Sequence, residues 1–173
     1  MLPKLTLVLG GAASGKSAFA ETLVKRAERS LTYFATAQIF DDEMRDKVSR
    51  HKATRGEDWY TIEEPLEVGA ALAKIDADQA VLLDCATMWL SNHLLAENDI
   101  AKAESALFDG LAQCPAPVIV VSNEVGLSVV PENALARRFR QAQGELNQKL
   151  AAEAELVVNV IAGLPQVLKG TLP

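Results

Sequence analysis

The chain has 173 residues, of which 49% are hydrophobic and 23% charged, with a formal net charge of -6 and a mean hydropathy of +0.09. This composition is typical of one globular domain large enough to bury its own core. The acidic balance argues against a general nucleic-acid-binding protein, because such proteins neutralise phosphates with a basic surface. No apolar run approaches the roughly 20 residues of a membrane-spanning helix, and no signal-peptide pattern precedes the first strand, so we expect a cytoplasmic protein.

The first predicted strand, Leu5–Leu9, leads into a sequence that fits the phosphate-loop pattern G-x-x-x-x-G-K-[ST] without a mismatch. The loop consists of Gly10, Gly11, Ala12, Ala13, Ser14, Gly15, Lys16 and Ser17. Its glycines allow positive φ and bring N–H groups up to phosphate oxygens, Lys16 can reach the β- and γ-phosphates, and the Ser17 hydroxyl can hold Mg²⁺. A chance match in a small-residue turn is the alternative, but a strand precedes the loop and a helix is predicted over Ser17–Arg29. We therefore predict a nucleoside triphosphate site.

Further apolar runs alternate with segments that have helical periodicity. The strands predicted after the first are Leu31–Ala35, Ala80–Asp84, Val118–Ser122 and Leu156–Ile161. Helices are expected from Asp41–Glu43, from Pro65 through Ile75, over Thr87–Asn98, and from Pro131 with an apolar face that runs from Leu135 to Leu150. This alternation predicts an α/β fold with a mostly parallel central sheet flanked by helices, and its continuous apolar runs predict strands buried on both faces.

The strand Ala80–Asp84 ends in a carboxylate, which is the pattern of the acid that holds Mg²⁺ in phosphate-loop proteins. An ordinary strand-end aspartate that begins a turn is the alternative. The phosphate loop upstream favours the functional interpretation, in which Ser17 and Asp84 bind one Mg²⁺.

A basic segment with one histidine interrupts the otherwise acidic chain. It contains Arg45, Lys47, Arg50, His51, Lys52 and Arg55. Such a cluster can bind phosphates, or it can be a solvated helix face that balances nearby acidic residues. Met44, Val48 and His51 share one helical face, so His51 is a partly buried core residue, a general base or a nucleophile. A metal site is disfavoured because no second histidine or cysteine stands at ligand spacing.

The remaining histidine and the cysteines are expected to be structural. His93 is surrounded by helix-forming apolar residues, and Cys85 and Cys114 should pack as small buried side chains. The sequence lacks the Asn-Lys-x-Asp motif of signalling GTPases, for which Ser122–Val125 is the nearest strand-end sequence. A small-molecule kinase and a RecA-like ATPase both remain open at this point, because fold does not fix function.

Several segments together resemble the bifunctional adenosylcobinamide kinase/adenosylcobinamide-phosphate guanylyltransferase family of cobalamin biosynthesis, over essentially the whole chain. Besides the phosphate loop, the resemblance is carried by Tyr33–Gln38, Asp42–Met44, Arg50–Lys52, Arg55, Trp59, Thr61, Glu63, Leu82–Cys85, Ser122–Gly126, Val130–Asn133, Arg137, Phe139–Arg140 and Asn147–Gln148. The loop is generic, whereas the segment around His51 and the stretch from Asn123 to Gln148 are specific. The chain departs from the family at Ala13, where arginine is usual.

The resemblance implies a RecA-like P-loop fold, a homotrimer and two reactions that use ATP, GTP and Mg²⁺. In the first reaction a nucleoside triphosphate phosphorylates the aminopropanol hydroxyl of adenosylcobinamide. In the second, GMP passes from GTP to adenosylcobinamide phosphate through a GMP-histidine intermediate, which maps to His51, and the products are adenosyl-GDP-cobinamide and pyrophosphate. The nucleotide contacts implied outside the loop are Ala35, Thr36, Ala37, Lys52, Ala53, Thr54, Arg55, Glu63 and Asp84.

Overall fold

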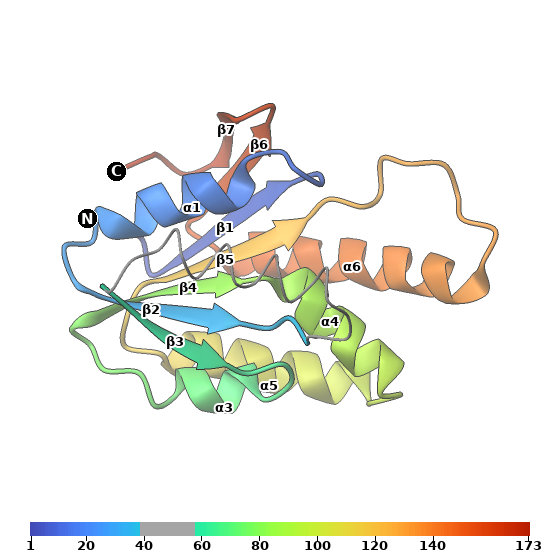
Figure 1. Cartoon of the computed structure of the whole chain (residues 1–173), viewed down its shortest axis with the longest axis horizontal. Coiled ribbons are helices and arrows are strands. Elements are labelled where there is room, and N and C mark those ends of the chain that lie inside the picture. Colours follow the sequence, from blue (N-terminus) through green and yellow to red (C-terminus); the bar gives the residue numbers. More distant parts are fainter. Residues whose placement is uncertain (39–57) are drawn as a thin grey trace.

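A mostly parallel sheet forms the centre of the protein (Figure 1). In the computed structural model, which describes residues 1–38 and 58–173, the strand order is β3-β2-β4-β5-β1-β6-β7. The strands are β1 (Leu5–Gly10), β2 (Ser30–Ala35), β3 (Trp59–Glu63), β4 (Gln79–Asp84), β5 (Val118–Asn123), β6 (Leu156–Ile161) and β7 (Leu164–Lys169). All neighbours pair in parallel except β6 and β7. The predicted α/β fold is confirmed, and β5 lies between β1 and β4, as expected for RecA-like topology.

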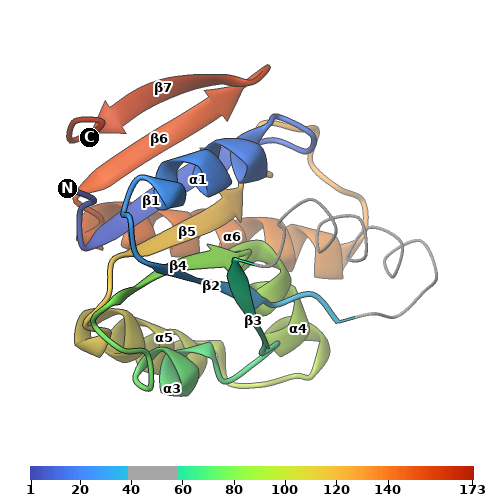
Figure 2. The same cartoon turned by 60° about the vertical axis from the view of Figure 1, so that its left-hand side comes forward.

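Helices cover both faces of this sheet. The described helices are α1 (Lys16–Lys25), α3 (Val68–Leu72), α4 (Ala86–Leu95), α5 (Ile100–Gln113) and α6 (Ala134–Glu153). Helix α1 lies on one face, whereas α3 to α6 lie on the other (Figures 1 and 2). None of the helices in the described parts of the chain is long and apolar enough to cross a membrane.

Two hydrophobic cores follow from this layering, one on each face of the sheet. Because side chains alternate along a strand, Val118 and Val120 of β5 pack with α4, α5 and α6, while Ile119 and Val121 pack with α1. All four are at most 1% exposed. The prediction that this strand is buried on both faces is confirmed.

Two predicted helices begin later than the sequence indicated. Pro131 lies outside α6, whose N-cap is Asn133: its side chain accepts a hydrogen bond from the Ala136 N–H at 3.1 Å. Leu135, expected on the apolar face, is 48% exposed because it lies in the first turn, ahead of the buried part of the helix. The helix expected from Pro65 is reduced to α3 (Val68–Leu72). The helix expected from Asp41–Glu43 lies outside the described residues.

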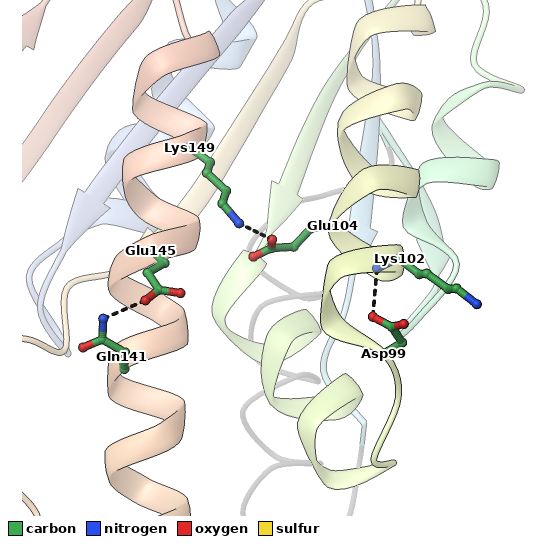
Figure 3. A network of polar contacts seen from close by, with 6 residues as sticks. All are labelled: Asp99, Lys102, Glu104, Gln141, Glu145 and Lys149. Atoms are coloured by element: carbon green, nitrogen blue, oxygen red, sulfur yellow. Dashed lines mark hydrogen bonds and ion pairs between the residues drawn. The ribbon is translucent and has the colours of Figure 1, made fainter.

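Helix α5 and the edge strands β3 and β7 were not predicted. Asp99 caps α5 by accepting the Lys102 N–H at 3.2 Å, and Glu104 of α5 pairs with Lys149 of α6 (Figure 3). The Glu104 side chain is only 10% exposed, so this ion pair links α5 to α6 through a largely buried carboxylate. On the outer side of α6, Gln141 donates to Glu145 one turn later at 2.7 Å.

Candidate functional site

The phosphate loop connects β1 to α1 in the conformation that the motif requires. Gly15 has φ of 91° and Ala13 has φ of 54°, so the chain visits the left-handed region twice before α1 begins. A Cβ on Gly10 would lie 2.3 Å from Ser14 Oγ and 2.7 Å from the Val160 carbonyl oxygen, so a larger residue would not fit. The stretch from Gly11 to Gly15 is mostly exposed. It is thus open to a ligand at the N-terminus of a helix, where anions are favoured.

The lysine of the motif folds back over this loop. Lys16 Nζ donates to the Gly11 carbonyl oxygen at 3.4 Å. Its ammonium group therefore lies against the same turn whose N–H groups would hold the phosphates.

Neighbouring strands fix the loop from outside. The Glu124 N–H, just after β5, donates to the Gly10 carbonyl oxygen at 3.1 Å. The Gly163 N–H, in the turn between β6 and β7, donates to the Ser14 carbonyl oxygen at 2.8 Å. Two loop carbonyls are thus held by segments that lie more than a hundred residues further along the chain.

Three polar residues end strands at the edge of the sheet where the phosphate loop lies. Glu63, Ala35 and Asp84 stand side by side in the register of β3, β2 and β4, and Asn123 stands beside Gly10 in the register of β5 and β1. Ala35, Asp84 and Asn123 stand two positions after Tyr33, Leu82 and Val121, respectively. The side chains of these three earlier residues pack in the core on the α1 face. By strand alternation Glu63, Asp84 and Asn123 belong to that same face, on which Lys16 and Ser17 begin α1.

The surroundings of Cys85 connect Asp84 to the phosphate loop. Burial and, to a lesser extent, the negative charge of Asp84 raise the pKa of the Cys85 thiol to about 11. The N–H groups of Met88 and Thr87 and the positive charge of Lys16 act on this pKa in the opposite direction. The charges of both Asp84 and Lys16 therefore act on this one buried thiol.

A buried threonine holds the strand end that carries Asp84. Thr36 Oγ1 donates to the Cys85 carbonyl oxygen at 2.7 Å and accepts from the Cys85 N–H at 2.9 Å. Asn92 of α4 then donates to the Thr36 and Pro65 carbonyl oxygens at 2.8 and 3.0 Å, and so joins the loops that follow β2 and β3. Thr36 is fully buried, so its side chain acts on the site through Cys85 and Asp84.

Asn123 is a site residue that the sequence reasoning missed. Its N–H donates to Thr87 Oγ1 at 2.8 Å, and its carbonyl oxygen accepts from Asn147 Nδ2 at 3.1 Å, so its backbone is clamped between α4 and α6. Its buried Oδ1 has no hydrogen-bond partner in the described ranges 1–38 and 58–173. The strand alternation of Val118–Asn123 was the signal that could have placed this amide on the same face as Asp84.

His93 has a structural environment, as expected. In the tautomer that satisfies both contacts, its Nε2–H donates to the Leu66 carbonyl oxygen at 3.1 Å, and its Nδ1 accepts from Asn98 Nδ2 at 3.0 Å. The ring also packs edge-on against Trp89. With both nitrogens engaged and 4% of the residue exposed, the imidazole is not available for chemistry.

Part of the predicted site lies outside the described residues. These positions are His51, Lys52, Ala53, Thr54 and Arg55. Within the described ranges no group of three or more His, Cys, Asp or Glu side chains could hold a metal ion. An ion bound by Ser17, Asp84 and a nucleotide needs no such group, because Mg²⁺ in nucleotide sites takes one or two protein oxygens and completes its shell with phosphates and water.

Comparison with known proteins identifies the family of this chain. A family model described as cobinamide kinase / cobinamide phosphate guanyltransferase matches residues 6–168. The chain belongs to this family. Members of the cobinamide kinase / cobinamide phosphate guanyltransferase family are bifunctional enzymes, which confirms the resemblance seen in the sequence.

Curated relatives match along nearly their whole length. The bifunctional adenosylcobalamin biosynthesis protein CobP of Pseudomonas aeruginosa is 42% identical, over 95% of this chain and 96% of its own. The protein CobU of Salmonella typhimurium, described in the same words, is 41% identical over 95% and 99%. Among solved structures, the RadB recombinase is a remote likeness, with 20% identity, a TM-score of 0.48, and coverage of 91% of this chain and 74% of that one.

Proposed function

We propose that this chain phosphorylates adenosylcobinamide with a nucleoside triphosphate and then transfers GMP from GTP to the new phosphate. The observation that carries the proposal is the nucleotide site itself: a complete phosphate loop lies at the same sheet edge as Asp84, which belongs to the face covered by α1, in a chain of a bifunctional family. The family membership supports the substrate class, and the geometry supports the use of a triphosphate.

In the kinase step the described residues act by positioning and by charge. The aminopropanol oxygen attacks the γ-phosphorus, the bond from γ-phosphorus to the bridging oxygen breaks, a nucleoside diphosphate leaves, and the hydroxyl proton passes to solvent. The loop N–H groups and Lys16 hold the phosphate oxygens on which charge develops. Ser17 and Asp84 offer the hard oxygen ligands that suit Mg²⁺, which would neutralise charge on the β- and γ-phosphates.

For the guanylyl transfer we propose His51 as the nucleophile. A neutral imidazole nitrogen attacks the α-phosphorus of GTP, and pyrophosphate leaves. The phosphate oxygen of adenosylcobinamide phosphate then attacks the same phosphorus, and the P–N bond breaks. One difficult transfer thereby becomes two easier ones. Lys52 and Arg55 supply positive charge beside the departing pyrophosphate, and Ala53 and Thr54 belong to the same proposed nucleotide contact.

The nucleotide would extend along the sheet edge from the phosphate loop. Ala35 and Glu63 end the strands beyond Asp84, and Ala37 lies just after β2, which supports these three positions as GTP contacts. Thr36, which is fully buried, would act on the nucleotide through Cys85 and Asp84. We assign GTP to the guanylyl transfer and allow either ATP or GTP in the kinase step, where the contacts are to phosphates that both nucleotides share.

We also propose a cytoplasmic homotrimer. Large apolar side chains on the segment between β5 and α6 support an assembly, since Leu127, Val129 and Val130 are 93%, 90% and 65% exposed. Light scattering coupled to size-exclusion chromatography tests the subunit number, and replacement of Leu127 and Val129 by serine should shift the protein towards the monomer.

The test of the function uses GTP labelled at the α-phosphate, with label on the denatured protein as the readout. We expect label on the wild type that is lost in mild acid and survives alkali, as a phosphoramidate should be. His51→Ala should abolish the label and the formation of GDP-cobinamide, while phosphorylation of adenosylcobinamide survives.

The other histidine provides the matched control. His93→Gln should keep the label. Label that persists in His51→Ala, or that resists acid, would move the nucleophile elsewhere. A wild type that phosphorylates adenosylcobinamide without taking up label would be a plain small-molecule kinase, and hydrolysis without any transfer to the corrinoid would indicate an ATPase.

A further inference from the structure

The last strand, β7, contributes little to the hydrophobic core, whereas β6 beside it is largely buried. All six residues of β7 are exposed, and the strand lies at the edge of the sheet next to β6 (Figure 2). Burial of apolar surface is therefore a poor reason for its presence. Strand β7 instead forms a hairpin with β6, and the turn of this hairpin consists of Ala162 and Gly163. Both residues have positive φ, 51° and 78°.

This turn packs directly against the phosphate loop. The Gly163 N–H donates to the Ser14 carbonyl oxygen at 2.8 Å. A Cβ on Gly15 would lie 3.1 Å from Gly163 Cα, so the absence of a side chain at Gly15 lets the two backbones approach closely. The contact joins residues that are about 150 positions apart in the chain, and it lies on the outer side of the loop.

The contact determines the direction of a second group. The Ser14 carbonyl and the Gly15 N–H belong to one peptide unit, which is trans and planar, so they point in opposite directions. A hydrogen bond that holds the carbonyl outward, toward Gly163, therefore turns the Gly15 N–H inward, toward the concave side of the loop, where phosphates bind.

We propose that the Gly163 N–H is a positioning group for triphosphate binding. It pre-orients the Gly15 N–H toward the phosphates before the nucleotide arrives. The inference rests on the proposed nucleotide site and adds a residue to it from the opposite end of the chain. Because the group acts on phosphates alone, its effect should be the same for every nucleotide base.

Contacts at both ends of the hairpin fix its position relative to the rest of the protein. At its open end Lys169 Nζ donates to the Ala151 and Ala152 carbonyl oxygens at the end of α6, at 3.1 and 2.8 Å. At the other end β6 pairs with β1 up to Val160 beside Gly10. The turn is therefore fixed relative to the strand from which the phosphate loop begins.

A pair of matched glycines gives a direct test. Gly163 and Gly170 flank β7 and both have φ of 78°, but only Gly163 contacts the phosphate loop. Proline at either position cannot adopt this φ and removes the N–H. Gly170→Pro should lower Tm at least as much as Gly163→Pro, because a Cβ at position 170 would also lie 2.3 Å from the Glu155 carbonyl oxygen.

Titration calorimetry in the presence of Mg²⁺ would give Kd for three probes: inorganic tripolyphosphate and the β,γ-imido analogues of GTP and ATP. Gly163→Pro should raise all three Kd values by about 10-fold to 100-fold, the range for one hydrogen bond to a charged group. Gly170→Pro should stay within about twofold of the wild type, which is small on the same scale.

Equal losses in the two variants, no loss in Gly163→Pro, or a loss confined to one base would overturn the inference. A wild type that binds none of the probes would instead contradict the proposed function. If Gly163→Pro does not fold, the pair Gly163→Val and Gly170→Val replaces it, because a β-branched residue also resists positive φ.

Discussion

The two halves of the site are built by different means. At the β1 end, phosphates would be held by backbone N–H groups of the loop, whose carbonyls are fixed by Glu124 and Gly163. At the β2 and β4 end, the groups that would act on the nucleotide are side chains such as Asp84. Thr36 holds the strand end that carries Asp84.

The difference explains which substitutions each half tolerates. A backbone-built half needs glycines at a few places, such as Gly10 and Gly15, and accepts many side chains elsewhere. A half built from side chains depends instead on individual functional groups. Substitutions in the backbone-built half should therefore act through the conformation of the loop, and those in the other half through the loss of a functional group.

The largest effect is expected at Lys16, whose side chain adds a positive charge to the backbone-built half. Lys16→Ala should lower kinase turnover by about 10²-fold to 10³-fold, because it removes a charge that stabilises the transferred phosphoryl group. Steady-state phosphorylation of adenosylcobinamide measures this, with Lys25→Ala at the other end of α1 as the control. Unchanged turnover in a folded Lys16→Ala variant would contradict the phosphate-loop assignment.

A second prediction concerns Cys85, which directly follows Asp84 in the half built from side chains. Because burial and Asp84 raise its pKa from 9.0 to about 11, the thiolate fraction at pH 8 should be about 100-fold below that of a free thiol. Alkylation by iodoacetamide in a Cys114→Ser background should therefore be slow and rise with pH up to about 11.

The stability that comes from this neutral buried thiol has a matching pH dependence. It is fully present below pH 9.0 and is lost as the pH rises toward the folded-state value of about 11. Rapid alkylation of the native protein at pH 8 would show that the thiol is not buried beside Asp84 as described.

A smaller effect is expected at Thr36, in the half built from side chains. Thr36→Val leaves the N–H and carbonyl of Cys85 without their partner, and should cost about 1 to 3 kcal/mol of unfolding free energy in urea. Thr6→Val is the matched control, since Thr6 is equally buried and its Oγ1 has no hydrogen-bond partner among the described residues. That control should be neutral or stabilising, and equal losses at both positions would refute the positioning role of Thr36.

Most of the central sheet could be predicted from the sequence because its strands are continuous apolar runs. Helix α5 was also predictable: Ile100, Leu107 and Leu111 share one face behind the capping residue Asp99, although Gly110 weakens the pattern. The edge strand β7 was not, because its residues are all exposed and show no burial pattern.

The parts of the site that depend on local sequence patterns could be predicted, whereas the parts that depend on contacts between distant residues could not. The phosphate loop is a continuous motif, and Asp84 ends an obvious strand. The hydrogen bond from Gly163 to Ser14 depends on the pairing of β6 with β1, which no local pattern reveals. Asn123 falls between these cases, because alternation along β5 gives its face but not the buried clamp formed by Thr87 and Asn147.

The central claim is that the two halves act on one nucleotide and one Mg²⁺. The most direct test is a double-mutant cycle between Ser17 of the phosphate loop and Asp84 of β4, measured as the Mg²⁺ dependence of adenosylcobinamide phosphorylation. If both bind the same ion, Ser17→Ala and Asp84→Asn should each raise the Mg²⁺ concentration at half-maximal rate, and the double variant should be little worse than the poorer single variant. Losses that simply multiply would show that the two residues act independently, and would contradict a single shared site.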